Sequence, residues 1–287
     1  MTSSDQGKLT ADGRAIQAYF EENAEPWRAR YSQNSFEAHT YQQCARHALG
    51  WIAALSAGAG PDRRLLEIGS GAGIQAAAAA AGGWRVTGTD FAREMLRTAA
   101  RQPGPRWVGA AAESLPFRGG QFDVVLLLGL LGYLADPERV LSDLCGYLRP
   151  GGHLIASWAS SYTDHHILLN DVSRVISAVP DFLYSAIKSR LTGRPVGGAT
   201  EDPGFYVRHN RNWDEREFCT MLQRAGYRVV AVRAVNFGVL RFMGRAPWRE
   251  GMDLAITRMI ERTVNRGPLA FLRNYARAHV VLATPQA

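Results

Sequence analysis

The sequence predicts an α/β fold: a doubly wound, mainly parallel seven-stranded sheet with an N-terminal helical cap and helical insertions. Short apolar runs alternate with amphipathic segments from residue 64 onward, as in βαβ units. A glycine-rich turn follows the first apolar run, where a strand would lead into a helix. With 46% hydrophobic and 21% charged residues, the 287-residue chain can bury a core, which excludes global disorder.

The elements can be placed in order along the chain. Apolar side chains recur at helical spacing within 9–55, which predicts two or three helices before the sheet. Strands are expected at 65–68, 85–89, 106–109, 122–128, 153–158, 227–235 and 278–283. Helices are expected at 75–81, 92–101, 137–148 and 213–224. Residues 1–60 are therefore predicted as the helical cap and 61–287 as the main domain, with insertions at about 160–212 and 236–277.

Composition narrows the functional classes. The only lysines are Lys8 and Lys188, which argues against Schiff-base chemistry. Cys44, Cys145 and Cys219 are odd in number and form no Cys-x-x-Cys pair, so we expect a reducing compartment and no metal site. No apolar run reaches the roughly 18 residues of a membrane span, and the N-terminus is polar. These features predict a soluble cytoplasmic protein.

The turn after the first strand predicts a nucleoside site. Its glycines, Gly69, Gly71 and Gly73, allow a sharp turn and a close ligand approach. The helix that follows offers free N–H groups. Seventeen residues after Gly73, Asp90 ends the second strand, where a carboxylate can accept both hydroxyl protons of a ribose.

The order Gly-x-Gly-x-Gly, opened by Glu67, differs from the Gly-x-Gly-x-x-Gly of dinucleotide binders. It resembles the first motif of the class I S-adenosylmethionine (SAM) dependent methyltransferases. The resemblance continues in order at 86–91, 113–117, 122–125 and 148–152. It is greatest to the branch that methylates small molecules, including ubiquinone and menaquinone precursors and secondary metabolites. It implies a Rossmann-like fold, SAM as cofactor, and methyl transfer to an O, N or C atom of a small-molecule acceptor in secondary metabolism or quinone or lipid biosynthesis.

The resemblance also implies a cofactor site. Its members would be Tyr31, Arg46, Glu67, Gly69, Gly71, Gly73, Asp90, Phe91, Met95, Ala112, Glu113, Leu128 and Gly129. Asp90 would hold the ribose hydroxyls, and Phe91 with Met95 would cover the adenine. Tyr31 and Arg46 would close over the SAM carboxylate, although Arg46 is equally well explained as a surface charge.

Two further contacts follow from the same resemblance. Ala112 and Glu113 would line the adenine edge, and the backbone at Leu128 and Gly129 would face the SAM amino group. Many relatives carry an acidic residue where this sequence has Ala111. Glu113 or a backbone carbonyl would then have to accept from the adenine amino group.

Acceptor chemistry is expected after the fourth and fifth strands, because ligands of open α/β sheets bind at the carboxyl ends of strands. Tyr133 borders this region, and His165 and His166 are the best candidates for a general base. His39 and His209 are weaker candidates, and any of these histidines could instead be a solvated polar residue. The segment 128–133 contains no Asn/Asp-Pro-Pro-Tyr loop and no cysteine, which excludes amino-directed DNA and protein methyltransferases and cytosine C5 enzymes.

The basic excess of the chain lies in its second half. Residues 1–150 hold 15 basic and 15 acidic side chains, whereas 201–287 hold 14 and 8. An arginine stripe, Arg258, Arg262 and Arg266, shares a predicted helix with an apolar face. That face consists of Met252, Ile256, Met259, Ile260 and Val264. Three interpretations of this helix are open. It could pack on the core with a solvated charged face, make peripheral membrane contact through 250–277, or guide a hydrophobic or anionic acceptor. No nucleic-acid module is present, so no nucleic-acid partner is expected.

Two other functions remain open. Tyr184 and Lys188 match the Tyr-x-x-x-Lys of short-chain dehydrogenases, but the glycine motif lacks the order of an NAD(P)-dependent oxidoreductase. A methyltransferase-fold protein could also bind SAM and catalyse a non-methylation reaction such as cyclisation. The oligomeric state is left open.

Overall fold

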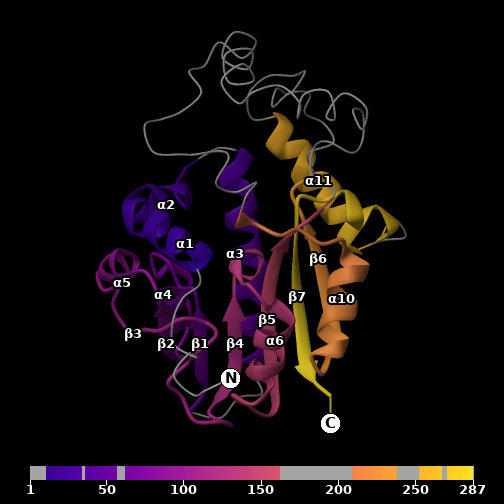
Figure 1. The fold of residues 1–287 in the computed structure, drawn as a ribbon. Coiled ribbons are helices and arrows are strands. Elements are labelled where there is room, and N and C mark those ends of the chain that lie inside the picture. Colours follow the sequence, from indigo (N-terminus) through magenta and orange to yellow (C-terminus); the bar gives the residue numbers. More distant parts are fainter. Residues whose placement is uncertain are drawn as a thin grey trace.

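The computed structural model describes residues 11–33, 36–56, 62–161, 209–237, 252–266 and 270–286. They form a seven-stranded sheet in the order β3-β2-β1-β4-β5-β7-β6 (Figure 1). The strands are β1 (Arg64–Ile68), β2 (Arg85–Asp90), β3 (Arg106–Gly109), β4 (Phe122–Leu127), β5 (Leu148–Ala159), β6 (Tyr227–Val235) and β7 (Ala278–Pro285). β7 pairs antiparallel with β5 and β6, and the other pairs are parallel. The predicted fold class is confirmed.

Helices cover both faces of the sheet. Helices α3 (Phe36–Leu55) and α4 (Ile74–Ala81) share one buried cluster with strand side chains such as Leu65. Helices α6 (Pro137–Cys145) and α10 (Glu215–Arg224) share the other with side chains such as Leu66. Neighbouring residues of β1 thus enter opposite layers, which is why consecutive positions such as Leu65 and Leu66 are both apolar.

Three further helices complete the side of the molecule that carries β1–β3. Helices α1 (Ala11–Glu22) and α2 (Ala24–Arg30) both pack on α5 (Arg93–Ala99), which follows β2. A 3-10 turn, η1 (Leu131–Tyr133), follows β4. These elements meet where β1, β2 and β4 end, and they position the site described below.

Two details of the sequence prediction need correction. Strand β5 begins at Leu148, not at residue 153: Leu148 pairs with Phe122, the chain then bulges, and pairing resumes at His153. Met259, expected on the buried face of its helix, is 61% exposed. The buried positions of α11 (Met252–Arg266) include Thr257 and Glu261.

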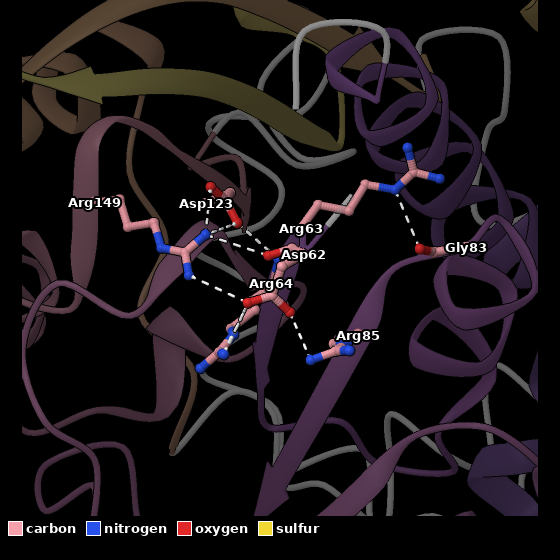
Figure 2. A network of polar contacts seen from close by, with 7 residues as sticks. All are labelled: Asp62, Arg63, Arg64, Gly83, Arg85, Asp123 and Arg149. Carbon is pink, nitrogen blue, oxygen red and sulfur yellow. Dashed lines mark hydrogen bonds and ion pairs between the residues drawn. The ribbon is translucent and has the colours of Figure 1, made fainter. Parts of the chain in front are cut away.

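A polar network joins the amino ends of the central strands (Figure 2). Asp123 accepts from the backbone N–H of Arg64 at 2.7 Å and pairs with Arg149 at 3.0 Å. Asp62 pairs with Arg64 at 2.9 Å and with Arg85 at 2.6 Å, and these arginines lower the pKa of the Asp62 carboxyl. Because parallel strands share their amino ends, this network braces the edge of the sheet opposite to the ligand crevice.

Within the described residues, no helix combines the length and apolar character needed to cross a membrane.

Candidate functional site

The turn between β1 and α4 requires glycine for two different reasons. Gly71 has φ of +51°, and a Cβ there would lie 3.4 Å from Nε1 of Trp27. Gly73 has φ of +74°, and its Cβ would lie 2.4 Å from the ring of Trp107. Gly71 therefore brings the backbone close to the cap, whereas Gly73 allows α4 to pack on β3.

Asp90 holds this turn in place. Its Oδ2 accepts from the N–H of Gly71 at 2.8 Å, and its Oδ1 accepts from the N–H of Ala92 at 2.9 Å. Burial raises the pKa of the Asp90 carboxyl to about 6, although the backbone hydrogen bonds oppose that shift. Each carboxylate oxygen keeps a second lone pair, so Asp90 can accept further hydrogen bonds from a ligand.

A partly open cavity lies beside the turn. Its wall contains Gly13, Ile16, Phe20, Trp27, Tyr31, Glu67, Ile68, Gly69, Ser70, Gly71, Gln75, Asp90, Phe91, Met95, Ala110, Ala111, Ala112, Glu113, Leu128, Gly129, Leu130, Tyr133 and Leu134. Every cofactor-site residue expected from the sequence is among them except Arg46 and Gly73. Arg46 is exposed on α3, while its helix neighbours Cys44 and Ala48 are buried.

The floor of the cavity holds buried polar groups that lack partners within the described residues. Oε2 of Glu67 and Nε2 of Gln75 have no hydrogen-bond partner. Burial, with a contribution from Asp90, raises the pKa of Glu67 to about 8. Burial and Glu67 also raise the pKa of Tyr31, whose hydroxyl faces Gln75. Gln75 was missed from the sequence; its position in the first turn of the helix after the glycines is the signal that could have found it.

Aromatic side chains form another part of the cavity wall. Phe20 meets Trp27 edge-to-face at a centroid distance of 5.3 Å and Tyr133 at 5.4 Å. Phe20 and Trp27 come from the cap, and no sequence motif assigned them to the site. Burial raises the pKa of Tyr133, so its hydroxyl stays protonated near neutral pH.

Hydrogen bonds fix the cap beside the end of β2. The carboxylate of Glu21 accepts from the backbone N–H of Arg93 at 2.8 Å and of Glu94 at 2.7 Å, at the start of α5. The side-chain amide of Gln17 donates to the carbonyl of Phe91 at 2.8 Å. Helix α1 is thereby anchored next to Asp90, and its side chains form part of the cavity wall.

The charge of the wall is one-sided. Glu67, Asp90 and Glu113 line the cavity, whereas no lysine, arginine or histidine does among the described residues. Acidic side chains favour ligands that carry positive charge or donate hydrogen bonds. In the part of the chain that the structure describes, no cluster of histidine, cysteine and carboxylate side chains could hold a metal ion.

The structure describes only some of the histidines that were predicted as candidate general bases. His165 and His166 lie outside the described residues. His209 contacts Asp12 of α1, with 2.5 Å between Nδ1 and Oδ1. His39 is buried beside Glu261 at 3.3 Å and does not line the cavity.

Comparison with known proteins agrees with this geometry. Residues 66–156 match the family model described as a methyltransferase domain. An uncharacterized methyltransferase of Mycobacterium sp. is 35% identical over 109 residues, which cover 37% of this chain and 43% of the relative. A demethylmenaquinone methyltransferase of Renibacterium salmoninarum is 25% identical over 185 residues, covering 64% and 74%. Residues 66–156 are thus similar to a methyltransferase domain.

A solved methyltransferase structure shares this fold. Magnesium protoporphyrin IX methyltransferase of Synechocystis with bound SAM aligns with a TM-score of 0.58 at 13% identity, covering 98% of this chain and 100% of that one. The chain spans about two fifths of the length of the first curated relatives that it matches. The family-matched residues include the glycine turn, Asp90 and Glu113, but not the cap or α11.

Proposed function

We propose that this protein transfers a methyl group from SAM to a small, apolar acceptor. The observation that carries the proposal is the Asp90 carboxylate, held by two backbone amides beside the glycine turn in an acidic cavity. Burial keeps Glu67 protonated near neutral pH in the empty protein, and a cationic ligand beside its unpartnered oxygen would favour the charged carboxylate. SAM carries both an ammonium group and a sulfonium group.

The side chains divide the work of holding the cofactor. Asp90 would accept hydrogen bonds from the ribose hydroxyls, Phe91 and Met95 would pack on the adenine, and Glu113 would lie at the adenine edge. When bound, SAM supplies a methyl group activated by its sulfonium. The protein's part is therefore mainly to align the acceptor with that methyl group and to exclude water.

The apolar part of the cavity wall supports one kind of acceptor. Ile16 and Phe20 of the cap, with Tyr133 and Leu134 after β4, present apolar and aromatic surface, and the charged side chains of the wall are acidic. This lining supports a neutral, apolar acceptor rather than an anionic one. Relatives named demethylmenaquinone methyltransferase and ubiquinone biosynthesis O-methyltransferase are consistent with an aromatic ring of this kind. His165 and His166 remain the proposed bases for a hydroxyl acceptor.

The test uses SAM with a labelled methyl group. The purified protein is incubated with labelled SAM and an apolar small-molecule extract, and products are separated by chromatography. We expect label in an organic-soluble product and a loss of that label in Asp90→Asn. SAM binding without any transfer would favour a non-methylating reaction such as cyclisation, and absence of SAM binding would overturn the proposal.

We also propose that α11 contacts an anionic lipid surface. Arg258, Met259 and Arg262 are exposed on one side of this helix, and neither arginine has an ion-pair partner within the described residues. Basic side chains around an exposed apolar one suit the membrane interface. Sedimentation with phosphatidylglycerol vesicles should exceed that with phosphatidylcholine vesicles, and Arg258→Gln with Arg262→Gln should remove the difference. Equal binding to both vesicles would contradict this contact.

A further inference from the structure

The peptide unit between Leu128 and Gly129 forms part of the cavity wall just beyond β4. The N–H of Gly129 donates to Oγ of Ser157 at 2.9 Å. No cis peptide bond occurs in the described chain, and in a planar trans unit the C=O and N–H point in opposite directions. Because the N–H is turned into Ser157, which is absent from the cavity wall, the carbonyl of Leu128 is turned toward the cavity.

Close packing around its α-carbon does not account for the orientation of Gly129. It has φ of +70°, and a Cβ placed on it would meet no atom within 4 Å. Glycine in open space can adopt many backbone conformations at little cost. The hydrogen bond to Ser157 is therefore the interaction that fixes the peptide unit.

The position of Ser157 is itself fixed by the residues around it. It is 4% exposed on β5, next to Ala156, which pairs with the last residue of β4. The Gly129 amide donates to its hydroxyl, and an interaction with Ser157 partly offsets the rise that burial causes in the pKa of the Cys44 thiol on α3. Burial and these two neighbours hold the serine side chain in place.

We propose that Ser157 is a positioning residue for the cofactor's ammonium group. It fixes the Gly129 amide so that the Leu128 carbonyl is a preformed acceptor for N⁺–H. An acceptor that is already oriented need not be ordered when the ligand binds, and this raises affinity. The inference rests on the proposed function, because the ammonium belongs to the amino-acid part of SAM.

The test compares two ligands by calorimetry: S-adenosylhomocysteine (SAH) and its deamino analogue, which keeps the carboxylate but lacks the ammonium. In Ser157→Ala, SAH should bind about tenfold more weakly, the scale of one hydrogen bond to a charged group. The deamino analogue should change less than about twofold. Ser157→Cys is similar in shape, slightly larger, and keeps a weak acceptor, so its ratio of SAH to analogue affinity should lie between those of the wild type and the alanine variant.

Ser160→Ala is the matched control. Ser160 lies just beyond the end of β5, is fully buried and bonds the carbonyl of Asn274, away from the cavity. This variant should lose stability without changing the ratio of the two affinities. An unchanged ratio in both Ser157 variants would overturn the inference while leaving SAM binding intact. A wild-type protein that binds neither ligand would overturn the proposed function as well.

Discussion

Replacing Asp90 with asparagine removes the charge from the centre of the proposed cofactor site. In the wild type both carboxylate oxygens accept backbone hydrogen bonds, from Gly71 and Ala92. Asparagine offers one oxygen, and its NH2 group would face the second N–H. A buried donor left unpaired costs about 1–3 kcal/mol, so the free energy of unfolding of the empty protein should fall by that amount.

Ligand affinity should fall further. A hydrogen bond to a charged group contributes about 1.5–3 kcal/mol, so removing each hydrogen bond to the ribose should weaken SAH binding about 10- to 150-fold. For the wild type, affinity should also fall as pH drops through about 6, because Asp90 then becomes protonated and accepts less strongly. This pH dependence should be absent from Asp90→Asn.

Calorimetry with SAH and urea unfolding separate the two effects. Asp123→Asn is the matched control, since Asp123 also accepts a backbone hydrogen bond but lies at the opposite edge of the sheet. It should lower the free energy of unfolding and leave SAH affinity unchanged. If Asp90→Asn bound SAH within twofold of the wild type, the assignment of Asp90 to the ribose would be refuted.

Three further predictions concern the surroundings of the cavity. Folding raises the pKa of Glu67 from about 4.5 to about 8, so the empty folded state retains a proton that the unfolded state has lost. The free energy of unfolding should therefore fall as pH rises from 6.5 to 8, and Glu67→Gln should flatten that slope; a wild-type slope of zero would refute the burial argument. Gly73→Ala should destabilise the protein by about 1–3 kcal/mol in thermal unfolding, because its Cβ would collide with Trp107, and adding Trp107→Leu should recover part of the loss. Glu21→Gln should loosen α1, seen as faster hydrogen exchange in residues 11–22 with the sheet unaffected, since a glutamine side chain has one oxygen and can accept from just one of the two backbone amides of α5; unchanged exchange would show that the carboxylate does not anchor the cap.

The sheet and the core of the site could be predicted because their signals are local. Parallel strands that are covered on both faces appear in the sequence as short apolar runs. The glycine turn at 69–73 and Asp90 form a motif within about 20 residues of sequence. The cap could not be predicted in the same way. Phe20 and Trp27 reach the cavity because Glu21 is anchored on α5, more than 70 residues away in sequence. No periodicity within α1 or α2 encodes that contact.

The rotation of a helix about its axis explains two differences from the sequence prediction: Arg46 does not line the cavity, and Met259 is exposed. On α3 the buried positions include Cys44 and Ala48, which leaves Arg46 on the outer side. On α11 a charged residue, Glu261, is buried because it accepts from the N–H of Asn236 at 2.6 Å. Met259 is consequently turned outward. When a buried polar contact such as that of Glu261 sets the rotation of a helix about its axis, a hydrophobicity pattern predicts the wrong side chains to be buried.

The central claim is that the cavity beside Asp90 binds SAM, and a calorimetric titration of the folded wild-type protein with SAH at pH 7.5 tests it most directly. The structure predicts saturable binding with one SAH per chain. A folded protein that gives no binding to SAH, or that binds NADPH in its place, would contradict the claim.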